Sequence, residues 1–314
     1  MPPSRRAHRR LPKRVAVALV LFLGGCAALA VGLPGSATDD LRIGIVTDIH
    51  AHDIDSPLED KWMTHTAERL RTFTDAMNAW PAELVIELGD FVNGWVVLGA
   101  HPGEPDRIPD ILSWADGLLA EFDGPRYHVI GNHDVYNLSK EQYLDRLGME
   151  ATAFSFDAGM YHVVVLDLQY DEQGADLTHT YTGVQGWVPS DEIAWLRADL
   201  ATTARPTIVC VHQMLDVDVS RFQGYPLVGN CLEVRRLLAE SGVVIAVFQG
   251  HEHDSRYTQI DGIHYVTFEA LVDQGTPASW AYVTLDPASQ TITIAGAGEQ
   301  EDYSLKYEAP RREE

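Results

Sequence analysis

Residues 41–50 read LRIGIVTDIH, an apolar run that leads directly into Asp48 and His50. Short uninterrupted runs of this kind are typical of strands that are buried on both faces of a sheet. Four later segments repeat the design: 84–90 (LVIELGD), 127–134 (YHVIGNHD), 207–212 (TIVCVH) and 243–253 (VVIAVFQGHEH). Ligands of open α/β sheets bind outside the carboxyl ends of the strands. We therefore expect the polar residues at these five ends to meet in one site.

The remaining pattern predicts an α/β fold. Further apolar runs predict additional strands at 161–168, 264–268, 281–285 and 291–295. Helix-like stretches lie between the earlier strands, near 58–79, 108–122, 190–200 and 232–241. Ser190 is expected to cap the third of these helices, ahead of acidic residues in its first turn. Strands that alternate with helices indicate a layered α/β fold. The last three strands have no helices between them, so we expect them to form a second sheet beside the first.

Seven side chains at the strand ends are candidate metal ligands: Asp48, His50, Asp90, Asn132, His212, His251 and His253. They offer oxygen and imidazole donors without thiolate, which suits Mn, Fe, Zn, Co or Mg. A single open catalytic zinc needs about three protein ligands. Seven candidates therefore fit two divalent ions that share one carboxylate, an arrangement that recurs in phosphatases and nucleases. The glycines at 89, 131 and 250 are expected to let the chain turn where a ligand must project.

Each of these motifs also has an ordinary structural interpretation. Gly89-Asp90 alone is a turn, and His212 alone is equally well a hydrogen-bonded core histidine. His251 and His253 are more specific, because alternate residues of a strand face the same side. The joint order of the motifs, each at a strand end, favours a metal site over scattered structural residues.

Those motifs in that order, over about residues 41–270, resemble the calcineurin-like metallophosphoesterase superfamily. The resemblance implies a two-sheet β-sandwich flanked by helices. It also implies a first metal bound by Asp48, His50 and His253, and a second bound by Asn132, His212 and His251, with Asp90 bridging both. His133 would act as general acid for the leaving group or steady the pentacovalent phosphorus. Asp134 would orient His133, as a carboxylate behind a working imidazole does.

The family resemblance predicts the function. A binuclear phosphoesterase would hydrolyse a phosphodiester, a phosphomonoester or a nucleotide pyrophosphate by attack of a metal-bridging hydroxide. Three segments, at 89–94, 131–137 and 262–267, look like the manganese-dependent ADP-ribose/CDP-alcohol diphosphatase branch, as does 188–190 ahead of Trp195. The alternative is a catalytically silent surface module of the same fold that binds metals. The complete set of family ligands argues against that alternative.

Three further residues near the motifs are candidate substrate contacts. His52 follows the first ligand pair, where the alternative is an ordinary solvated loop residue. Trp95 and Tyr136 offer rings that stack on a base or sugar, although aromatic residues near a site are as often packing.

Residues 1–37 differ from the rest of the chain. Six basic residues precede an apolar run from Val15 to about Leu33, the pattern of a signal peptide or an N-terminal membrane anchor. Cleavage after Ala37 and lipid attachment at Cys26 are both open. The expected organisation is this segment, a catalytic domain over 38–300 and a charged, frayed tail over 301–314, and the expected location is extracytoplasmic.

Charge narrows the range of partners. All 46 acidic residues and 17 of the 23 basic residues lie beyond residue 37, which leaves 17 − 46 = −29 for that part. Such a surface repels nucleic-acid polymers and anionic lipid. We therefore expect a small phosphorylated substrate and membrane contact only through the N-terminal segment. Whether Cys210 and Cys231 pair is open at this stage.

Overall fold

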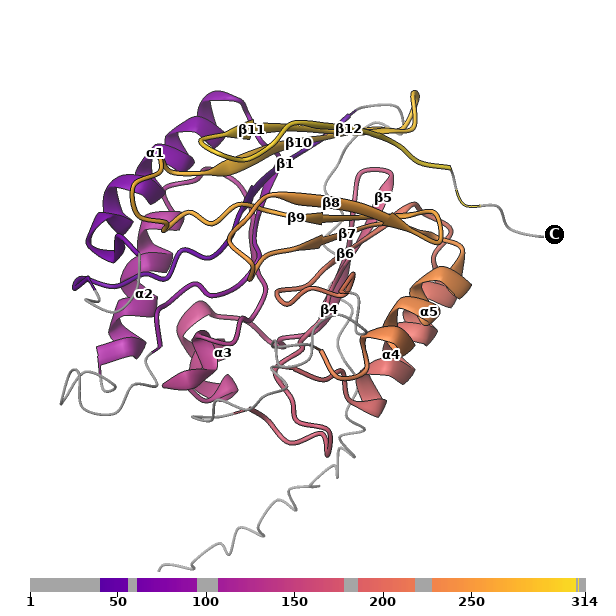
Figure 1. Cartoon of the computed structure of the whole chain (residues 1–314), viewed down its shortest axis with the longest axis horizontal. Coiled ribbons are helices and arrows are strands. Elements are labelled where there is room, and N and C mark those ends of the chain that lie inside the picture. The colour runs from indigo at the N-terminus through magenta and orange to yellow at the C-terminus, as the bar shows by residue number, and fades with distance from the viewer. Residues whose placement is uncertain are drawn as a thin grey trace, which may run out of the picture.

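The computed structural model describes residues 40–55, 61–94, 107–177, 186–217, 228–308 and 310. This part of the chain forms two six-stranded sheets that pack face to face, with helices on both outer faces (Figure 1). The predicted two-sheet sandwich flanked by helices is confirmed. The N-terminal segment 1–37 lies outside the described residues. Within them, no helix is both long and apolar enough to cross a membrane.

The first sheet combines strands from both ends of the chain. Its strands are β1 (Leu41–Val46), β2 (Leu84–Glu87), β3 (Arg126–His128), β10 (Trp280–Asp286), β11 (Thr291–Ala297) and β12 (Tyr303–Lys306). Their order is β12-β11-β10-β1-β2-β3, and β1, β2 and β3 run parallel. The carboxyl ends of these three strands therefore lie at one edge of the sheet.

The second sheet is built from the middle of the chain. Its strands are β4 (Phe154–Ala158), β5 (Tyr161–Val165), β6 (Thr207–Cys210), β7 (Val244–Gln249), β8 (Arg256–Ile260) and β9 (Ile263–Thr267). Their order is β4-β5-β6-β7-β9-β8, with β5, β6, β7 and β9 parallel. The ends of β6 and β7, which carry three of the candidate ligands, thus share an edge as well.

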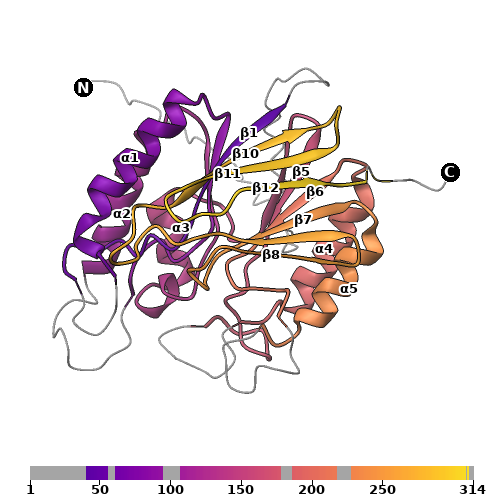
Figure 2. The same ribbon diagram turned by 45° about the horizontal axis from the view of Figure 1, so that its top comes forward.

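Helices cover the outer faces of both sheets (Figure 2). The helices are α1 (Thr66–Ala79), α2 (Ile108–Leu119), α3 (Lys140–Leu147), α4 (Ser190–Thr202) and α5 (Cys231–Ser241). The first three lie on the first sheet, and α4 and α5 lie on the second. Leu70, Phe73 and Met77 of α1 share one helix face and pack against the sheet.

Alternate side chains of the central strands face different layers. In β5, Val163 and Val165 pack between the two sheets, whereas Val164 packs in the layer of α4 and α5. In β1, Ile43 and Ile45 point into the core between the sheets and Val46 points toward the layer of α1. Burial on both faces explains why these strands appear in the sequence as uninterrupted apolar runs.

The predicted grouping of the C-terminal strands is wrong. The strands predicted at 264–268, 281–285 and 291–295 do not form a sheet of their own, because β9 pairs with β7 while β10 and β11 continue the first sheet beside β1. An apolar run indicates that a strand is buried, but it does not identify the strand with which it pairs.

The predicted charged tail over 301–314 is also wrong in part. Residues 303–306 form β12, which pairs with β11, and Leu305 and Tyr307 are buried in the core between the sheets. Because alternate side chains of a strand face opposite ways, two inward residues suffice to hold a segment whose other residues are polar.

Two predicted helix starts differ from the structure, which also shows the state of the two cysteines. Ser190 is the first residue of α4 and does not cap it, since Pro189 occupies the N-cap without a side-chain hydrogen bond. Helix α1 begins at Thr66, later than the predicted position near residue 58. Cys210 and Cys231 are both buried and unpaired.

Candidate metal centre

The loops after five parallel strands bring the predicted ligands together. β1 leads into Asp48 and His50, β2 into Asp90, and β3 into Asn132. From the second sheet, β6 leads into His212, and β7 leads into His251 and His253. Ligand atoms lie within 4.8 Å of one another in a first group, Asp48, His50 and His253, and in a second group, Asp90, His212 and His251. Each group therefore takes side chains from both sheets.

Five of the seven candidate ligands have a left-handed backbone conformation. Asp48, His50, Asp90, His251 and His253 have φ between 43° and 73°. Residues other than glycine rarely adopt this region, and such conformations concentrate at functional sites where the surroundings impose them. The strand ends are thus bent sharply at the points where the side chains must project.

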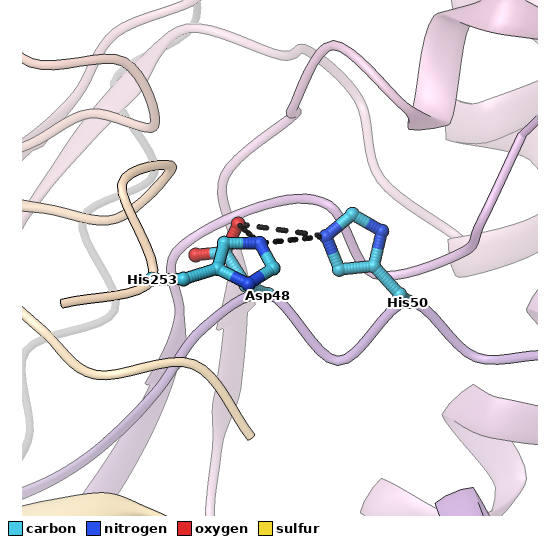
Figure 3. A group of neighbouring side chains, drawn as sticks. All are labelled: Asp48, His50 and His253. Atoms are coloured by element: carbon cyan, nitrogen blue, oxygen red, sulfur yellow. Dashed lines mark hydrogen bonds and ion pairs between the residues drawn. The ribbon is translucent and has the colours of Figure 1, made fainter. Parts of the chain in front are cut away.

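The side chains of the first group converge, as Figure 3 shows, and they include a buried carboxylate oxygen without a hydrogen-bond partner. Asp48 Oδ2 accepts hydrogen bonds from Thr47 Oγ1 at 2.7 Å and from the His251 amide at 2.9 Å. Asp48 Oδ1 has no hydrogen-bond partner and lies 3.3 Å from His253 Nε2 and 3.7 Å from His50 Nε2. The two Nε2 atoms are 3.1 Å apart. An oxygen and two imidazole nitrogens thus converge on one point, as three ligands of a cation do.

The second group shares an oxygen with the first. Asp90 Oδ2 lies 3.2 Å from His212 Nε2 and 3.7 Å from His50 Nε2, while its Oδ1 accepts the His133 amide at 2.7 Å. His212 Nε2 is also 3.2 Å from Asn132 Oδ1 and 3.2 Å from His251 Nδ1. Asp90 Oδ2 is therefore the atom that could bind two ions at once.

Both buried carboxylates are ionised despite their burial. Burial opposes their charge, but His253 and His212 hold the pKa of Asp48 well below the usual value, and His212 does so for Asp90. Burial alone would lower the pKa of His212, yet Asp90 and Asp48 raise it to about 9. The chain thus holds two negative charges in its interior, at the sites where two divalent cations would neutralise them. The donor set and the unpartnered Asp48 oxygen fit such a pair of ions.

The glycines near the site serve a purpose other than the predicted one at two positions. Gly131 and Gly250 do not have positive φ. A Cβ atom at Gly250 would overlap Thr47 Oγ1 and come within 2.7 Å of Asp48 Oδ2, and one at Gly131 would overlap Asp90. These glycines allow one ligand loop to pack directly against another.

Most of the sequence matches a known family. A family model described as calcineurin-like phosphoesterase matches residues 41–255. The chain belongs to the calcineurin-like phosphoesterase family. It is therefore a hydrolase that acts on phosphate esters or anhydrides, and its Asp and His groups hold two divalent metal ions.

Curated relatives match nearly the whole phosphoesterase domain. Manganese-dependent ADP-ribose/CDP-alcohol diphosphatases from Xenopus tropicalis and Danio rerio are each 23% identical to the chain. The first match covers 85% of this chain and 94% of the relative, and the second covers 84% and 97%. The fold is that of a solved dimetal phosphatase from Danio rerio, with a TM-score of 0.71, 20% identity, and coverage of 85% of this chain and 99% of that one.

In three of the candidate ligand histidines of the phosphoesterase, the ring nitrogen that points away from the cluster lies close to an oxygen atom. His50 Nδ1 lies 2.9 Å from Asn93 Oδ1, His212 Nδ1 lies 2.9 Å from the Leu88 carbonyl, and His253 Nδ1 lies 2.6 Å from Asp273 Oδ1. Each of these contacts fixes the orientation of its ring, so that Nε2 is the nitrogen that faces the cluster. None of these three acceptors was among the site residues predicted from the sequence. Asn93 lies inside the 89–94 motif, but nothing in the sequence marks Asp273.

The predicted role of Asp134 is wrong. Its carboxyl oxygens accept hydrogen bonds from the backbone N–H groups of Val92 at 3.0 Å and Gly131 at 2.8 Å, and among the described residues it forms no hydrogen bond or ion pair with the His133 ring. His133 Nδ1 instead donates to the Gly94 carbonyl at 3.2 Å. Burial, followed by the charges of Asp90 and Glu87, raises the pKa of the Asp134 carboxyl well above its usual value. Asp134 therefore ties two ligand loops together and does not orient His133.

His133 itself lies beside both metal groups. One of its ring nitrogens is within 4.8 Å of ligand atoms of His50 and Asp90, and its ring meets that of His50 edge-on at 4.5 Å. Burial, followed by the positive charge of Lys61, lowers the pKa of His133 well below its usual value. The imidazole is therefore neutral in the metal-free protein, with its free nitrogen, Nε2, unprotonated.

The structure describes two of the three residues that were predicted to contact the substrate, Tyr136 and His52. The ring of Tyr136 lies 4.9 Å from that of His133, and its hydroxyl accepts a hydrogen bond from Asn132 Nδ2 at 3.3 Å. Tyr136 thus supports two candidate site residues from within the protein. His52 is buried, and its Nδ1 accepts the Ile54 amide at 3.1 Å. Trp95 lies outside the described residues.

Proposed function

We propose that this phosphoesterase hydrolyses the pyrophosphate bond of a small nucleotide of the ADP-ribose or CDP-alcohol type, with manganese as a metal that supports the reaction. The observation that carries the proposal is the pair of ligand groups joined at Asp90 Oδ2, 3.2 Å from His212 and 3.7 Å from His50. Full-length relatives named as manganese-dependent ADP-ribose/CDP-alcohol diphosphatases support the choice of bond.

Each ligand group is assigned to one cation. Asp48, His50 and His253 would hold one cation, Asn132, His212 and His251 would hold the other, and Asp90 would contribute to both. Two bound cations lower the pKa of a water molecule and offset the charge that develops at phosphorus. Without such cations, a chain whose charge beyond residue 37 is −29 would repel an anionic substrate.

His133 meets the substrate beside these groups. Its Nδ1 is fixed on the Gly94 carbonyl, so Nε2 is the atom presented to the substrate. A bound phosphate brings negative charge, which favours the protonated imidazole. His133 then donates its Nε2 proton to the oxygen that leaves phosphorus or holds that oxygen by a charged hydrogen bond.

A substrate panel tests the proposal. The full chain, loaded with Mn²⁺, is incubated with ADP-ribose, a CDP-alcohol, bis(p-nitrophenyl) phosphate and p-nitrophenyl phosphate, and products are separated by anion-exchange chromatography. We expect AMP from ADP-ribose and CMP from the CDP-alcohol, with kcat/KM above those for the two nitrophenyl esters. If the diester were hydrolysed rapidly while both nucleotides stayed intact, the enzyme would be a phosphodiesterase and not a diphosphatase.

We further propose that the enzyme acts outside the cytoplasm. The support is the basic head and apolar run of residues 1–37. Fractionation of cells that express the full chain, and of cells that express a Cys26→Ser variant, tests this. Recovery of the full chain from the cytoplasm would refute export, and a shift of the variant from membrane to soluble extracytoplasmic fraction would identify Cys26 as the lipid attachment site.

A further inference from the structure

Asp273 differs from the other acceptors behind the ligand histidines because it is charged. Asn93 and the Leu88 carbonyl, behind His50 and His212, are neutral oxygens. Asp273 Oδ1 meets His253 Nδ1 at 2.6 Å, the short distance of a charge-assisted hydrogen bond. On the other side of the same ring, His253 Nε2 faces Asp48 Oδ1 at 3.3 Å. The His253 ring therefore lies between the Asp273 carboxylate and the Asp48 carboxylate.

The other imidazole of the first group, that of His50, has different surroundings. The Lys61 ammonium lies 3.2 Å from His50 Nδ1, so a positive charge sits behind that ring. A positive charge there withdraws electron density from His50 and weakens it as a donor, whereas the carboxylate behind His253 strengthens that donor. Within the first group, His253 is thus the imidazole best suited to bind a cation.

The loop that carries Asp273 is anchored at several points. Arg69, a buried residue of α1, donates hydrogen bonds to the carbonyl oxygens of Leu271, Asp273 and Thr276. The backbone of Asp273 also forms an antiparallel bridge with Lys61. The Asp273 side chain is 26% exposed, yet its backbone is fixed, so the carboxylate reaches His253 from a rigid support.

We propose that Asp273 is a positioning residue that holds His253 with Nε2 toward the first group and thereby sets how tightly that group binds a divalent cation. The carboxylate does not contact the cation. It selects the ring orientation and tautomer before the cation arrives, and it increases the basicity of Nε2. The second group has no corresponding carboxylate behind a ring among the described residues, so the effect falls on one ion of the pair.

Metal titration of matched variants tests this proposal independently of any substrate. Asp273→Asn keeps an oxygen acceptor and removes the charge, while Asp273→Ala removes both. The control is Asp157→Asn, because Asp157 makes a similar contact of 2.8 Å with His162 Nδ1, remote from the ligand groups. Each full-length variant is stripped with EDTA, checked for folding by circular dichroism, and titrated with Mn²⁺ by calorimetry.

We expect two equivalents of Mn²⁺ in the parent protein. In Asp273→Asn one equivalent should bind roughly 10–100-fold more weakly and the other as before, with a loss at least as large in Asp273→Ala. Asp157→Asn should match the parent. Two equivalents bound by Asp273→Asn with parental affinities would overturn the proposal, as would an equal weakening of both. Because no substrate is involved, failure of ADP-ribose hydrolysis would leave this result unaffected.

Discussion

The candidate metal ligands of this phosphoesterase combine two properties at the same residue. Asp48, His50, Asp90, His251 and His253 supply donor atoms and also occupy left-handed backbone conformations. Aspartate and histidine tolerate this region better than most residues, whereas β-branched residues avoid it. Each such conformation costs on the order of 1–3 kcal/mol, which the hydrogen bonds around the loops must offset. The identity of these residues is therefore set by backbone geometry as well as by coordination chemistry.

His133 provides the most direct test of chemistry at a single residue. Replacing His133 by Ala removes the imidazole beside both groups while leaving all seven candidate ligands in place. We expect kcat/KM for ADP-ribose to fall by roughly 10²–10⁴, the usual contribution of a proton donor. Mn²⁺ content, measured by elemental analysis, should stay at the parental value. An unchanged kcat/KM would remove His133 from the mechanism, and loss of metal would instead make it a ligand.

Asp134 should show the opposite behaviour. Its removal in Asp134→Ala leaves the buried amides of Val92 and Gly131 without acceptors, so we expect a loss of about 2–4 kcal/mol in the free energy of unfolding. Urea denaturation in EDTA measures this loss. A variant of parental stability with an altered pH–rate profile would support the rejected role, in which Asp134 orients His133.

At the scale of elements, the sequence predicts the strands that end in the site but not their assembly. β1, β2, β6 and β7 are recognisable because both of their faces are buried. The sequence pattern does not reveal β8, because its residues are only partly buried, or β12, because Leu305 is its one buried residue among exposed or partly exposed neighbours. Sheet membership depends on pairing between distant segments, such as β1 with β10, which no local pattern encodes.

The site shows the same division between local and distant information. All seven ligands directly follow apolar runs, so the sequence placed them. The contacts behind them do not follow such a pattern: Asp273 reaches His253 from 20 positions along the chain, and the Leu88 carbonyl meets His212 across 124 positions. Backbone acceptors in particular have no sequence signal, because every residue has a carbonyl.

His162 links three elements in a way that makes stability depend on pH. It lies on β5, between Asp157 of β4 at 2.8 Å and Asp199 of α4 at 2.9 Å. Burial lowers the pKa of His162, but hydrogen bonds to Asp199 and Asp157 outweigh it and raise the pKa above its ordinary value. The stabilisation is therefore complete below about pH 6.5 and is lost as pH rises through the folded-state pKa.

Replacing His162 by Gln tests this dependence. We expect a lower Tm than in the parent, with a deficit that is largest near pH 6 and shrinks toward pH 9, measured by calorimetry in EDTA so that metal binding does not contribute. His65→Gln is the control, since the side chain of His65 is 46% exposed, forms an ion pair with the exposed Glu68 and stacks on Trp62. A deficit of constant size across this pH range would show that the charge of His162 contributes nothing.

At the scale of the whole molecule, the two sheets are joined by metal ligands at one place and by the C-terminal segment at another. The first group combines Asp48 and His50 from the first sheet with His253 from the second, and the second group combines Asp90 with His212 and His251. Away from these groups, His264 of β9 lies 2.9 Å from the Lys306 carbonyl of β12, and the hydroxyls of Tyr161 and Tyr307 are 2.9 Å apart. The ligand groups and the C-terminal segment therefore lie at the same interface between the sheets.

Removal of residues 301–314 separates these two contributions. It takes Leu305 and Tyr307 out of the core between the sheets, each worth about 1.5–3 kcal/mol as an upper value, so the free energy of unfolding in EDTA should fall by roughly 3–6 kcal/mol. Deletion of 309–314 alone, which keeps β12 and Tyr307, is the matched control and should leave the free energy of unfolding unchanged.

Because a ligand that binds only the folded state adds about 2.7 kcal/mol at 100 times its Kd, Mn²⁺ should restore much of the loss in the truncated chain. Urea unfolding with and without Mn²⁺ measures both effects. A truncated chain that Mn²⁺ does not stabilise would show that the ligand groups no longer span two correctly placed sheets, and an undiminished stability in EDTA would show that β12 contributes nothing to the sandwich.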